Sequence, residues 1–316
     1  AGLLADGLAR RFFFVRYLLG GAHLRLRVEV DQADAPAAAA RMRHAAAAFL
    51  ARAPSPQPED PERIRRRNRG IIVSDPFADQ ADDVVVEDNT VHDRPVHFEV
   101  DRYGGEARFD DSLDLFAVSS VETLRALEAD AGGPAGRRAA GQMRLLLRQA
   151  WGHAASADEL VRLADYGGEM FGATPLAQLL PVADAAFERG RAGTCALVRG
   201  ELAALARPGG RPALAEAARA LRAGLDGVPD GRRHAIGVSH LHMTANRLGL
   251  LNRDEVYLCR MLQRAVEAVA AEDPAFWRDA WDAHRAWAND PAPSLRDQAA
   301  ALLAGFAGQA ALATAA

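Results

Sequence analysis

The sequence predicts an α+β protein in which a mixed or antiparallel sheet packs with many helices in a single domain. Residues 12–17 (FFFVRY) and 23–30 (HLRLRVEV) alternate side chains between two faces, as β-strands do. From residue 119 onward the pattern is mostly helical, apart from a strand-like run at 234–243. Strands first, helices later and one returning strand are typical of an α+β fold, so we expect the late strand beside the early ones.

The first hundred residues contain the other predicted strands and one helix. The two early strands are joined by LLGGA, whose paired glycines suit a turn with positive φ. The high helix propensity of alanine predicts a helix at 35–52. The segment 53–70 is rich in proline and charge, which predicts an exposed loop. Two strand-like stretches follow, around 83–87 and 95–100.

The later part of the chain is expected to form a series of helices in the same domain, residues 1–316. Their predicted ranges are 120–130, 137–151, 157–165, 176–189, 195–206, 212–224, 253–271, 274–288 and 294–314. Three residue pairs have the spacing of a capping box, Ser119 with Glu122, Ser156 with Glu159, and Asn252 with Glu255.

Bulk properties are those of an ordinary globular protein. The net charge of −4 gives no reason to expect nucleic acid as a partner. No apolar run is long enough to span a membrane, and the early apolar run leads straight into Arg-rich sequence, unlike a signal peptide. Cys195 and Cys259 are isolated from one another, which favours a reduced, cytoplasmic location.

The chain contains no lysine, and all 38 of its basic residues are arginine. A chain without lysine forms no Schiff base, anchors no pyridoxal phosphate and has no P-loop lysine. No GxGxxG sequence follows a predicted strand, so a Rossmann-type nucleotide site is also unsupported. We therefore expect no cofactor.

One face of the second predicted strand is cationic. His23, Arg25 and Arg27 alternate with apolar residues and would share that face. Each guanidinium can hold a carboxylate or a carbonyl through two hydrogen bonds. A simple solvated surface is the alternative interpretation.

The late strand-like run would place two imidazoles on one face, because His240 and His242 alternate with Leu241. Two such imidazoles can share a metal, but no third and fourth ligands stand out, so we predict no metal site. General acid–base chemistry suits a histidine near neutral pH, and a structural histidine is the alternative. An error of one residue in register would exchange the faces.

Two further segments carry candidate functional groups. Glu99, Arg102 and Tyr103 precede a Gly-Gly turn, as either an internal ion pair or part of a site. A second Gly-Gly, in residues 166–169, is predicted to be a loop. Five arginines in seven residues form either a solvated charge run or a docking strip for an acidic peptide; they are Arg63, Arg65, Arg66, Arg67 and Arg69. Nucleic acid is disfavoured because no aromatic residues are interleaved with them.

Together these motifs resemble a known family. FFFVRY with HLRLR, E-x-x-RYGG before DSLDLFAVSS, and LHM-x-x-NRLGL occur in order across about residues 10–270. They resemble the small C-terminal domain of lantibiotic dehydratases, also called the thiopeptide-type bacteriocin biosynthesis domain. The resemblance implies elimination of glutamate from glutamylated Ser or Thr, with Arg25, Arg27 and His242 corresponding to the arginines and histidine of the family.

The resemblance implies one of two activities for a stand-alone chain without the large glutamylating domain. One is a detached glutamate-elimination subunit. The other, which we favour, is a pyridine synthase that joins two dehydroalanines of a leader-bearing peptide by a formal aza-(4+2) cycloaddition, with loss of water and of the leader. A stand-alone chain and a 53–70 segment able to dock a leader favour the second. A non-catalytic, leader-binding partner is a third hypothesis.

The candidate residues follow from these motifs. Catalytic candidates are His242, Arg25, Arg27, Tyr103 and Ser239. Substrate-binding candidates are Arg102, Glu99, His23, His240 and Tyr17, and the five arginines at 63–69 are candidates for leader docking. His242 or Tyr103 could carry a proton while the arginines hold a carbonyl oxygen. The expected partners are the dehydrated precursor peptide and other enzymes of the pathway.

Overall fold

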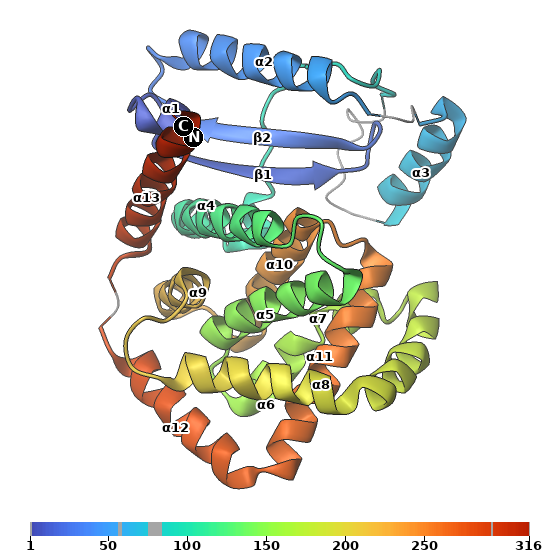
Figure 1. Ribbon diagram of the computed structural model, residues 1–316, viewed down its shortest axis with the longest axis vertical. Helices are drawn as coiled ribbons and strands as arrows, with labels where there is room; N and C mark the ends of the chain where they lie inside the picture. Colours follow the sequence, from blue (N-terminus) through green and yellow to red (C-terminus); the bar gives the residue numbers. More distant parts are fainter. Residues whose placement is uncertain (1, 56–58, 75–83, 292, 316) are drawn as a thin grey trace. The chain divides into compact units, whose positions relative to one another are not determined.

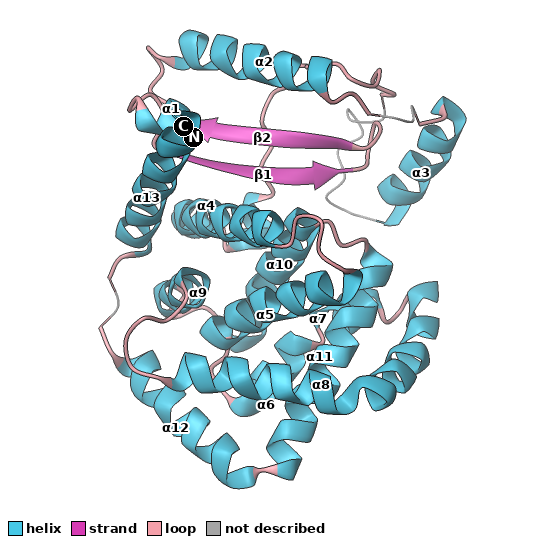
Figure 2. Ribbon diagram, viewed as in Figure 1, coloured by secondary structure: helices cyan, strands magenta, loops and turns pink. Residues whose placement is uncertain are grey.

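The computed structural model describes residues 2–55, 59–74, 84–291 and 293–315 (Figure 1). The chain forms two compact units, one made of residues 1–99 with 307–316 and one of residues 100–306. Helices and one antiparallel hairpin make up the regular structure of the described residues (Figure 2), which confirms the α+β class. The single-domain organisation stays a prediction.

The first unit is built on the predicted hairpin. Strands β1 (Arg11–Tyr17) and β2 (His23–Glu29) pair antiparallel, with Val15 opposite Arg25 and Phe13 opposite Arg27. Gly20 and Gly21 have φ of 85° and 122°, so the turn uses the left-handed backbone that the paired glycines predicted. The helices of this unit are α1 (Gly2–Ala5), α2 (Ala35–Arg52) and α3 (Pro61–Ser74). Helix α2 spans the range predicted for it.

The exposed loop predicted at 53–70 is wrong from Pro61 onward, because α3 begins there; residues 56–58 lie outside the described part. Ile64 and Asn68, one helical turn apart, are buried, and the Asn68 side chain accepts a hydrogen bond from Gly20 N at 3.1 Å. Burial of this narrow face, together with the good helix propensity of arginine, stabilises a helix in spite of the charge. The helix is thereby attached to the hairpin turn.

The strands predicted at 83–87 and 95–100 are also wrong. Residues 84–87 and 95–99 have no regular structure, residue 100 begins a 3-10 turn, and residue 83 lies outside the described part. Val84, Val96 and Phe98 are exposed, so these stretches lack the apolar surface that would fix them in a sheet.

The second unit is helical. Its elements are η2 (Val100–Tyr103), α4 (Glu106–Ala129), α5 (Ala135–His153), α6 (Ala157–Ala164), α7 (Tyr166–Phe171), η3 (Pro175–Leu179), α8 (Leu180–Ala206), α9 (Ala213–Gly224), α10 (Asp230–Leu248), α11 (Asn252–Glu272), α12 (Pro274–Asn289) and the first part of α13 (Leu295–Ala315), which ends in the first unit. Helix α5 packs on α9, and α8 on α11, around fully buried Trp151, Leu147 and Leu202. None of the described helices is both long and apolar enough to cross a membrane.

The late strand predicted at 234–243 is wrong, because this segment is the middle of helix α10. Within residues 234–250 the positions that are not buried are 235, 242–243, 246 and 249, which lie one or two helical turns apart on one side of the helix. The ten residues 234–243 are too short a stretch to show the helical period clearly, so this pattern alone could not be distinguished from that of a strand. Gly249, with φ of 83°, ends the helix in the left-handed conformation.

Other helix predictions are confirmed or corrected at their ends. Ser156 caps α6, accepting from Glu159 N at 3.1 Å, as its spacing predicted. The ranges 176–189 and 195–206 are one helix from residue 180, and α4 begins at Glu106, so Ser119 lies inside it and donates to a main-chain carbonyl. Residues 166–169 belong to the short helix α7 instead of a loop.

Candidate functional site

One acid–base pair in the second unit joins His242 on α10 to Glu255 on α11. His242 Nδ1 lies 2.8 Å from Glu255 Oε2, and the Tyr166 hydroxyl donates to the same oxygen at 3.1 Å. The Glu255 side chain is 1% exposed and the His242 side chain 19% exposed. A carboxylate accepts hydrogen bonds, so Nδ1 is the donating nitrogen and Nε2 is left to exchange a proton.

The connection between the two helices explains this pairing. Helix α10 ends at Leu248, just before Gly249, and α11 begins only a few residues later at Asn252. Asp254 accepts a hydrogen bond from Leu251 N at 3.1 Å and so satisfies the helix start. The cap predicted for Glu255 is therefore supplied by its neighbour, and Glu255 faces His242.

Helix α7 completes the arrangement with an aromatic residue at each end. Tyr166 is buried, and burial together with neighbouring acidic groups raises the pKa of its hydroxyl well above the usual range, so it remains a donor. The Phe171 ring lies edge-on to His242 with ring centroids 5.9 Å apart. A Cβ on Gly167 would lie 2.9 Å from the Glu255 backbone, so a glycine is needed for this close approach.

Arg102 and Ser239 lie next in this region. Arg102 Nε donates to Ser239 Oγ at 3.3 Å, and the Ser239 hydroxyl donates to the Ala235 carbonyl at 2.9 Å. Ser239 precedes His242 by three positions, which places both on neighbouring parts of one helix surface. The structure thus brings three of the predicted residues together: Arg102, Ser239 and His242.

Tyr103 and His240 lie in the core instead. Tyr103 is 5% exposed and its ring packs against Phe116 and His240, with centroids 5.0 and 5.1 Å apart. His240 is 1% exposed, with Nε2 at 3.2 Å from Ser112 Oγ. Burial holds the pKa of His240 well below its usual value, so the imidazole is neutral. A helix turns two positions by about 200°, which is why His240 and His242 do not share a face.

In the hairpin of the first unit, the side chains of His23, Arg25 and Tyr17 contact one another. Arg25 Nε donates to His23 Nε2 at 3.0 Å, and His23 Nδ1 therefore donates to the Gly21 carbonyl at 2.8 Å. The Arg25 guanidinium carbon lies 3.6 Å from the centre of the Tyr17 ring. The side chains of His23, Arg25 and Tyr17 are half-buried and oriented by one another.

Arg27 lies further along the same face, between two aromatic rings. Its guanidinium carbon is 5.5 Å from the Phe13 ring centre and 5.6 Å from that of Phe98. Glu99, the last residue of this unit before the boundary, is half-buried. On the opposite face of β2, Leu24 is 67% exposed, so the cationic face is the more buried of the two.

The predicted docking arginines all lie on α3, with different surroundings. Arg67 is half-buried; it is bonded to the Glu59 carboxylate and donates to the Leu18 carbonyl at 2.8 Å. Arg65 pairs with Glu62 on the same helix. Exposed arginines at three-residue spacing form a stripe along the helix, at Arg63, Arg66 and Arg69.

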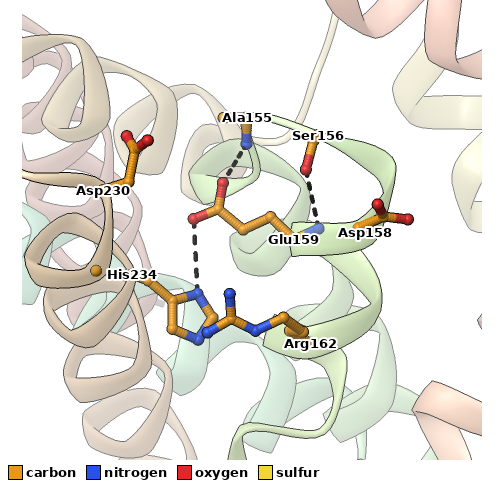
Figure 3. Close-up of a pocket in the computed structure, with 8 residues that line it drawn as sticks. Ala155, Ser156, Asp158, Glu159, Arg162, Asp230 and His234 are labelled. Carbon is orange, nitrogen blue, oxygen red and sulfur yellow. Dashed lines mark hydrogen bonds and ion pairs between the residues drawn. The ribbon is translucent and has the colours of Figure 1, made fainter.

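A separate pocket of about 330 Å³ opens beside His234 (Figure 3). His234 Nε2 lies 2.8 Å from Glu169 Oε2, and Nδ1 lies 3.6 Å from Glu159. Glu159 also accepts from Ala155 N at 2.7 Å. Glu159 on α6 and Glu169 on α7 both pair with His234 on α10, so we interpret this cluster as structural and take His242 as the candidate site.

Sequence reasoning missed Glu255 and Tyr166. Both were present in short patterns, N-x-x-E and YGGE, that were interpreted as a helix cap and a loop. Within the described residues, no group of three or more His, Cys, Asp or Glu side chains is placed to hold a metal ion.

Comparison with known proteins gives the family. The sequence matches the family "Lantibiotic biosynthesis dehydratase C-term" over residues 1–266. No curated protein matches the chain. Among solved structures, the fold is similar to "Pyridine synthase, TbtD, from thiomuracin biosynthesis", with a TM-score of 0.66 and 19% identity over 84% of this chain and 90% of that chain.

A second similar structure is that of TsrL, with a TM-score of 0.51 and 17% identity over 92% of this chain and 91% of that chain. At these identities the two structures establish a shared fold. The family match covers far more than half of the chain and agrees with the resemblance of its motifs. This protein belongs to the lantibiotic biosynthesis dehydratase C-terminal family.

Proposed function

We propose that this protein is a thiopeptide pyridine synthase, which joins two dehydroalanines of a leader-bearing linear peptide and releases the leader. The observation that carries the proposal is the likeness of fold to a chain described as a pyridine synthase, over 90% of that chain. The membership of the chain in a peptide-modifying biosynthetic family supports the same substrate class.

The reaction begins with a proton transfer. The amide nitrogen of one dehydroalanine loses its proton and the carbonyl oxygen gains one, giving an iminol that forms a 2-azadiene with the adjoining alkene. The two ends of this azadiene bond to the alkene carbons of the second dehydroalanine and close a six-membered ring. Loss of water, then of the leader as its carboxamide, gives the aromatic pyridine.

We assign the proton transfer to His242, whose Nε2 is available and whose Nδ1 is fixed by Glu255. Arg25 and Arg27 are proposed to stabilise carbonyl oxygen as it gains charge, because their planar guanidinium groups donate two parallel hydrogen bonds. Ser239, whose hydroxyl donates to the Ala235 carbonyl and accepts from Arg102, is proposed to orient the Arg102 guanidinium beside His242. Tyr103 is proposed to act by supporting this part of the helix, since its ring is buried.

Glutamate elimination is the second candidate function. It is favoured by the His242–Glu255 pair, because the same base could remove the α-proton while an arginine binds the departing carboxylate. Arg25 and Arg27, at the motif positions of the family's elimination residues, would supply that group.

Mass spectrometry of two leader-bearing peptides separates these functions. One peptide is linear and contains two dehydroalanines, and the other is its glutamylated precursor. Conversion of the first alone, to free leader and a cyclised core lighter by one water, is the result that the proposal predicts. Loss of glutamate from the second alone would contradict it and establish the elimination function.

We propose that the exposed α3 stripe of Arg63, Arg66 and Arg69 binds acidic residues of the leader. Replacing the three arginines by alanine is expected to weaken leader binding several-fold at low salt and less at high salt, because exposed charges are screened. The matched control for loss of surface charge replaces three exposed arginines of the other unit by alanine, namely Arg278, Arg285 and Arg296. Unchanged affinity in the triple variant would remove α3 from the docking proposal.

A non-catalytic, leader-binding role is distinguished by the same variants. That role requires His242→Ala to leave the pathway reaction intact. The enzyme proposal requires turnover to be lost while leader affinity, measured by titration, is retained. The buried free thiols of Cys195 and Cys259 support the proposed cytoplasmic location, where the precursor peptide and other pathway enzymes would be its partners.

A further inference from the structure

We propose that Glu255 and Tyr166 are positioning residues for His242, which hold its imidazole in the Nδ1–H tautomer and present Nε2 to the substrate. This inference rests on the proposed function in so far as His242 moves the proton. It adds two residues, on two further helices, to the chemistry assigned above.

The hydrogen bonds have a fixed direction. Glu255 Oε2 receives both the Tyr166 hydroxyl, at 3.1 Å, and the His242 Nδ1–H, at 2.8 Å. Neutral imidazole carries one N–H, so a proton on Nδ1 leaves the lone pair on Nε2. In water a free neutral imidazole has no such constraint, and the carboxylate therefore selects the tautomer.

Burial makes this selection strong. The Glu255 side chain is 1% exposed, and a charge removed from water is stable only when hydrogen-bonded or paired. When Nε2 takes a proton, the imidazolium lies directly against that buried carboxylate, where electrostatic attraction is stronger than in water. Tyr166 donates to the carboxylate and does not compete for the proton, since the pKa of its buried hydroxyl is raised well above the usual range.

The surrounding helices hold the three groups in place. Gly167 brings α7 against α11, with its Cβ position only 2.9 Å from the Glu255 backbone. At the other end of α7, Phe171 lies 5.9 Å from the His242 ring, centroid to centroid. The hydroxyl of Tyr166 and the ring of Phe171 thus restrain the carboxylate and the imidazole from the same short helix.

A purely structural ion pair is the alternative, and it predicts different data. It would stabilise the α10–α11 connection, and its loss would lower thermal stability without a selective effect on His242. A positioning role predicts a change in the tautomer and in kcat that depends on the presence of His242.

The first test uses the full-length protein without substrate. Nitrogen-15 NMR of histidine-labelled protein, with the His242 signals assigned by their loss in His242→Gln, reports which ring nitrogen carries the proton. The wild type is expected to show Nδ1–H, and Glu255→Gln is expected to lose that preference, because an amide can also donate to the ring. Glu267→Gln, the same change further along α11 at a 37% exposed glutamate, should leave the wild-type tautomer.

The second test uses turnover of the dehydroalanine peptide. Glu255→Gln is expected to lower kcat by about 10- to 100-fold with little change in KM, which is less than the roughly 10²- to 10⁴-fold contribution of an acid–base group itself. Tyr166→Phe, which removes one donor and keeps the ring, should lower kcat by a few-fold and serves as the second variant should Glu255→Gln fold poorly. In the His242→Ala background, Glu255→Gln should cause no further loss.

Two results would overturn the positioning role: an Nε2–H tautomer in the wild type, or an additive loss of kcat in the double variant. Failure of the proposed function is a separate result. If the protein leaves the dehydroalanine peptide unchanged, pyridine synthesis is contradicted, whereas the tautomer measurement still decides whether Glu255 orients His242.

Discussion

Two histidines only two positions apart have different environments in the second unit. His240 is fully buried, packs against Tyr103 and Phe116, and is neutral because burial lowers its pKa. His242 is partly exposed and paired with a carboxylate. The histidine suited to proton transfer is therefore the one whose ring reaches solvent.

Substitutions of the two rings are expected to separate the two roles. His242→Asn, whose side-chain amide can still donate to the buried Glu255 carboxylate, should lower turnover by about 100-fold or more while leaving the free energy of unfolding nearly unchanged. His240→Ala should instead lower the free energy of unfolding by about 2–4 kcal/mol, because it leaves a cavity in an aromatic cluster. Urea unfolding and peptide turnover, measured on both variants, check this division. Equal losses of stability in both would contradict it.

Sequence motifs indicated the candidate histidine, His242, but did not indicate that Glu255 is its partner. LHM-x-x-NRLGL led to His242, and His23 with Arg25 could be placed on one face because a strand alternates strictly. Glu255 could not be found in this way, since its contact with His242 depends on a tight link between two helices. A hydrogen bond across such a link has no fixed spacing in sequence.

Close approach of helices determines the position of α7. Gly167 lies against the backbone of Glu255, and Gly152 on α5 lies against α9, where a Cβ would be 2.3 Å from the Ala215 carbonyl oxygen. The sequence shows where these glycines are, but it does not show which backbone segments pack against them. The helix predictions succeeded where the apolar period was long, as in 253–271, and failed for the ten-residue window at 234–243.

Adding a methyl group at Gly167 tests this contact. Gly167→Ala should lower the free energy of unfolding by about 1–3 kcal/mol, because the Glu255 backbone leaves no space. Gly193→Ala is the matched control on α8, since a Cβ there meets no atom within 4 Å. It should stabilise the protein by about 0.5–1 kcal/mol through helix propensity. Urea titration of both variants shows whether each substitution raises or lowers the free energy of unfolding. An unchanged free energy in Gly167→Ala would show that α7 can move to make room for the methyl group.

His234 joins α10 to α6 and α7, and its contribution depends on pH. The Glu159 carboxylate, and then the hydrogen bond with Glu169, raise the pKa of His234, so its stabilisation is present below the unfolded pKa of about 6.5 and is lost as pH rises through the folded value. His234→Gln should therefore reduce the melting temperature more at pH 6 than at pH 9. Calorimetry at the two pH values checks this, and an equal reduction at both would contradict an ionic contribution.

Buried ionisable groups of the second unit give the protein a distinctive pH response. Burial lowers the pKa of His153 to about 3 and that of His284 to about 4. Below pH 6.5 these two histidines bind protons in the unfolded chain but not in the folded protein. The free energy of unfolding therefore falls with falling pH. Burial of Asp165 raises its pKa to about 6, which opposes this fall between pH 6 and its unfolded value near 3.8.

Substituting His284 and, separately, Asp165 tests these two opposing contributions to the pH dependence of stability. His284→Phe should weaken the loss of stability between pH 6.5 and 4 by up to about 3 kcal/mol. Asp165→Asn should make the same loss steeper, because it removes the opposing carboxyl group. Urea midpoints measured at intervals across this range give both slopes. Unchanged slopes in both variants would show that neither His284 nor Asp165 contributes to the pH dependence of stability.

The chain as a whole combines a cationic hairpin with a helical unit that carries a His–Glu–Tyr group. The family match over residues 1–266 places the chain in the lantibiotic biosynthesis dehydratase C-terminal family, and the activity that we propose for it uses an iminol, a proton carrier and oxygen-binding arginines. The α+β class could be predicted from the strand and helix patterns of the sequence. The activity could not be predicted from such patterns, because it depends on the chemistry of the peptide substrate.

The most direct measurement is the mass of the leader released in a single turnover of the peptide with two dehydroalanines, by wild type and by His242→Ala. The wild type is expected to form a leader ending in a carboxamide together with a dehydrated, cyclised core, and the variant to form both far more slowly. A leader ending in a carboxylate, or a peptide left unchanged beside a glutamylated precursor that loses glutamate, would contradict pyridine synthesis.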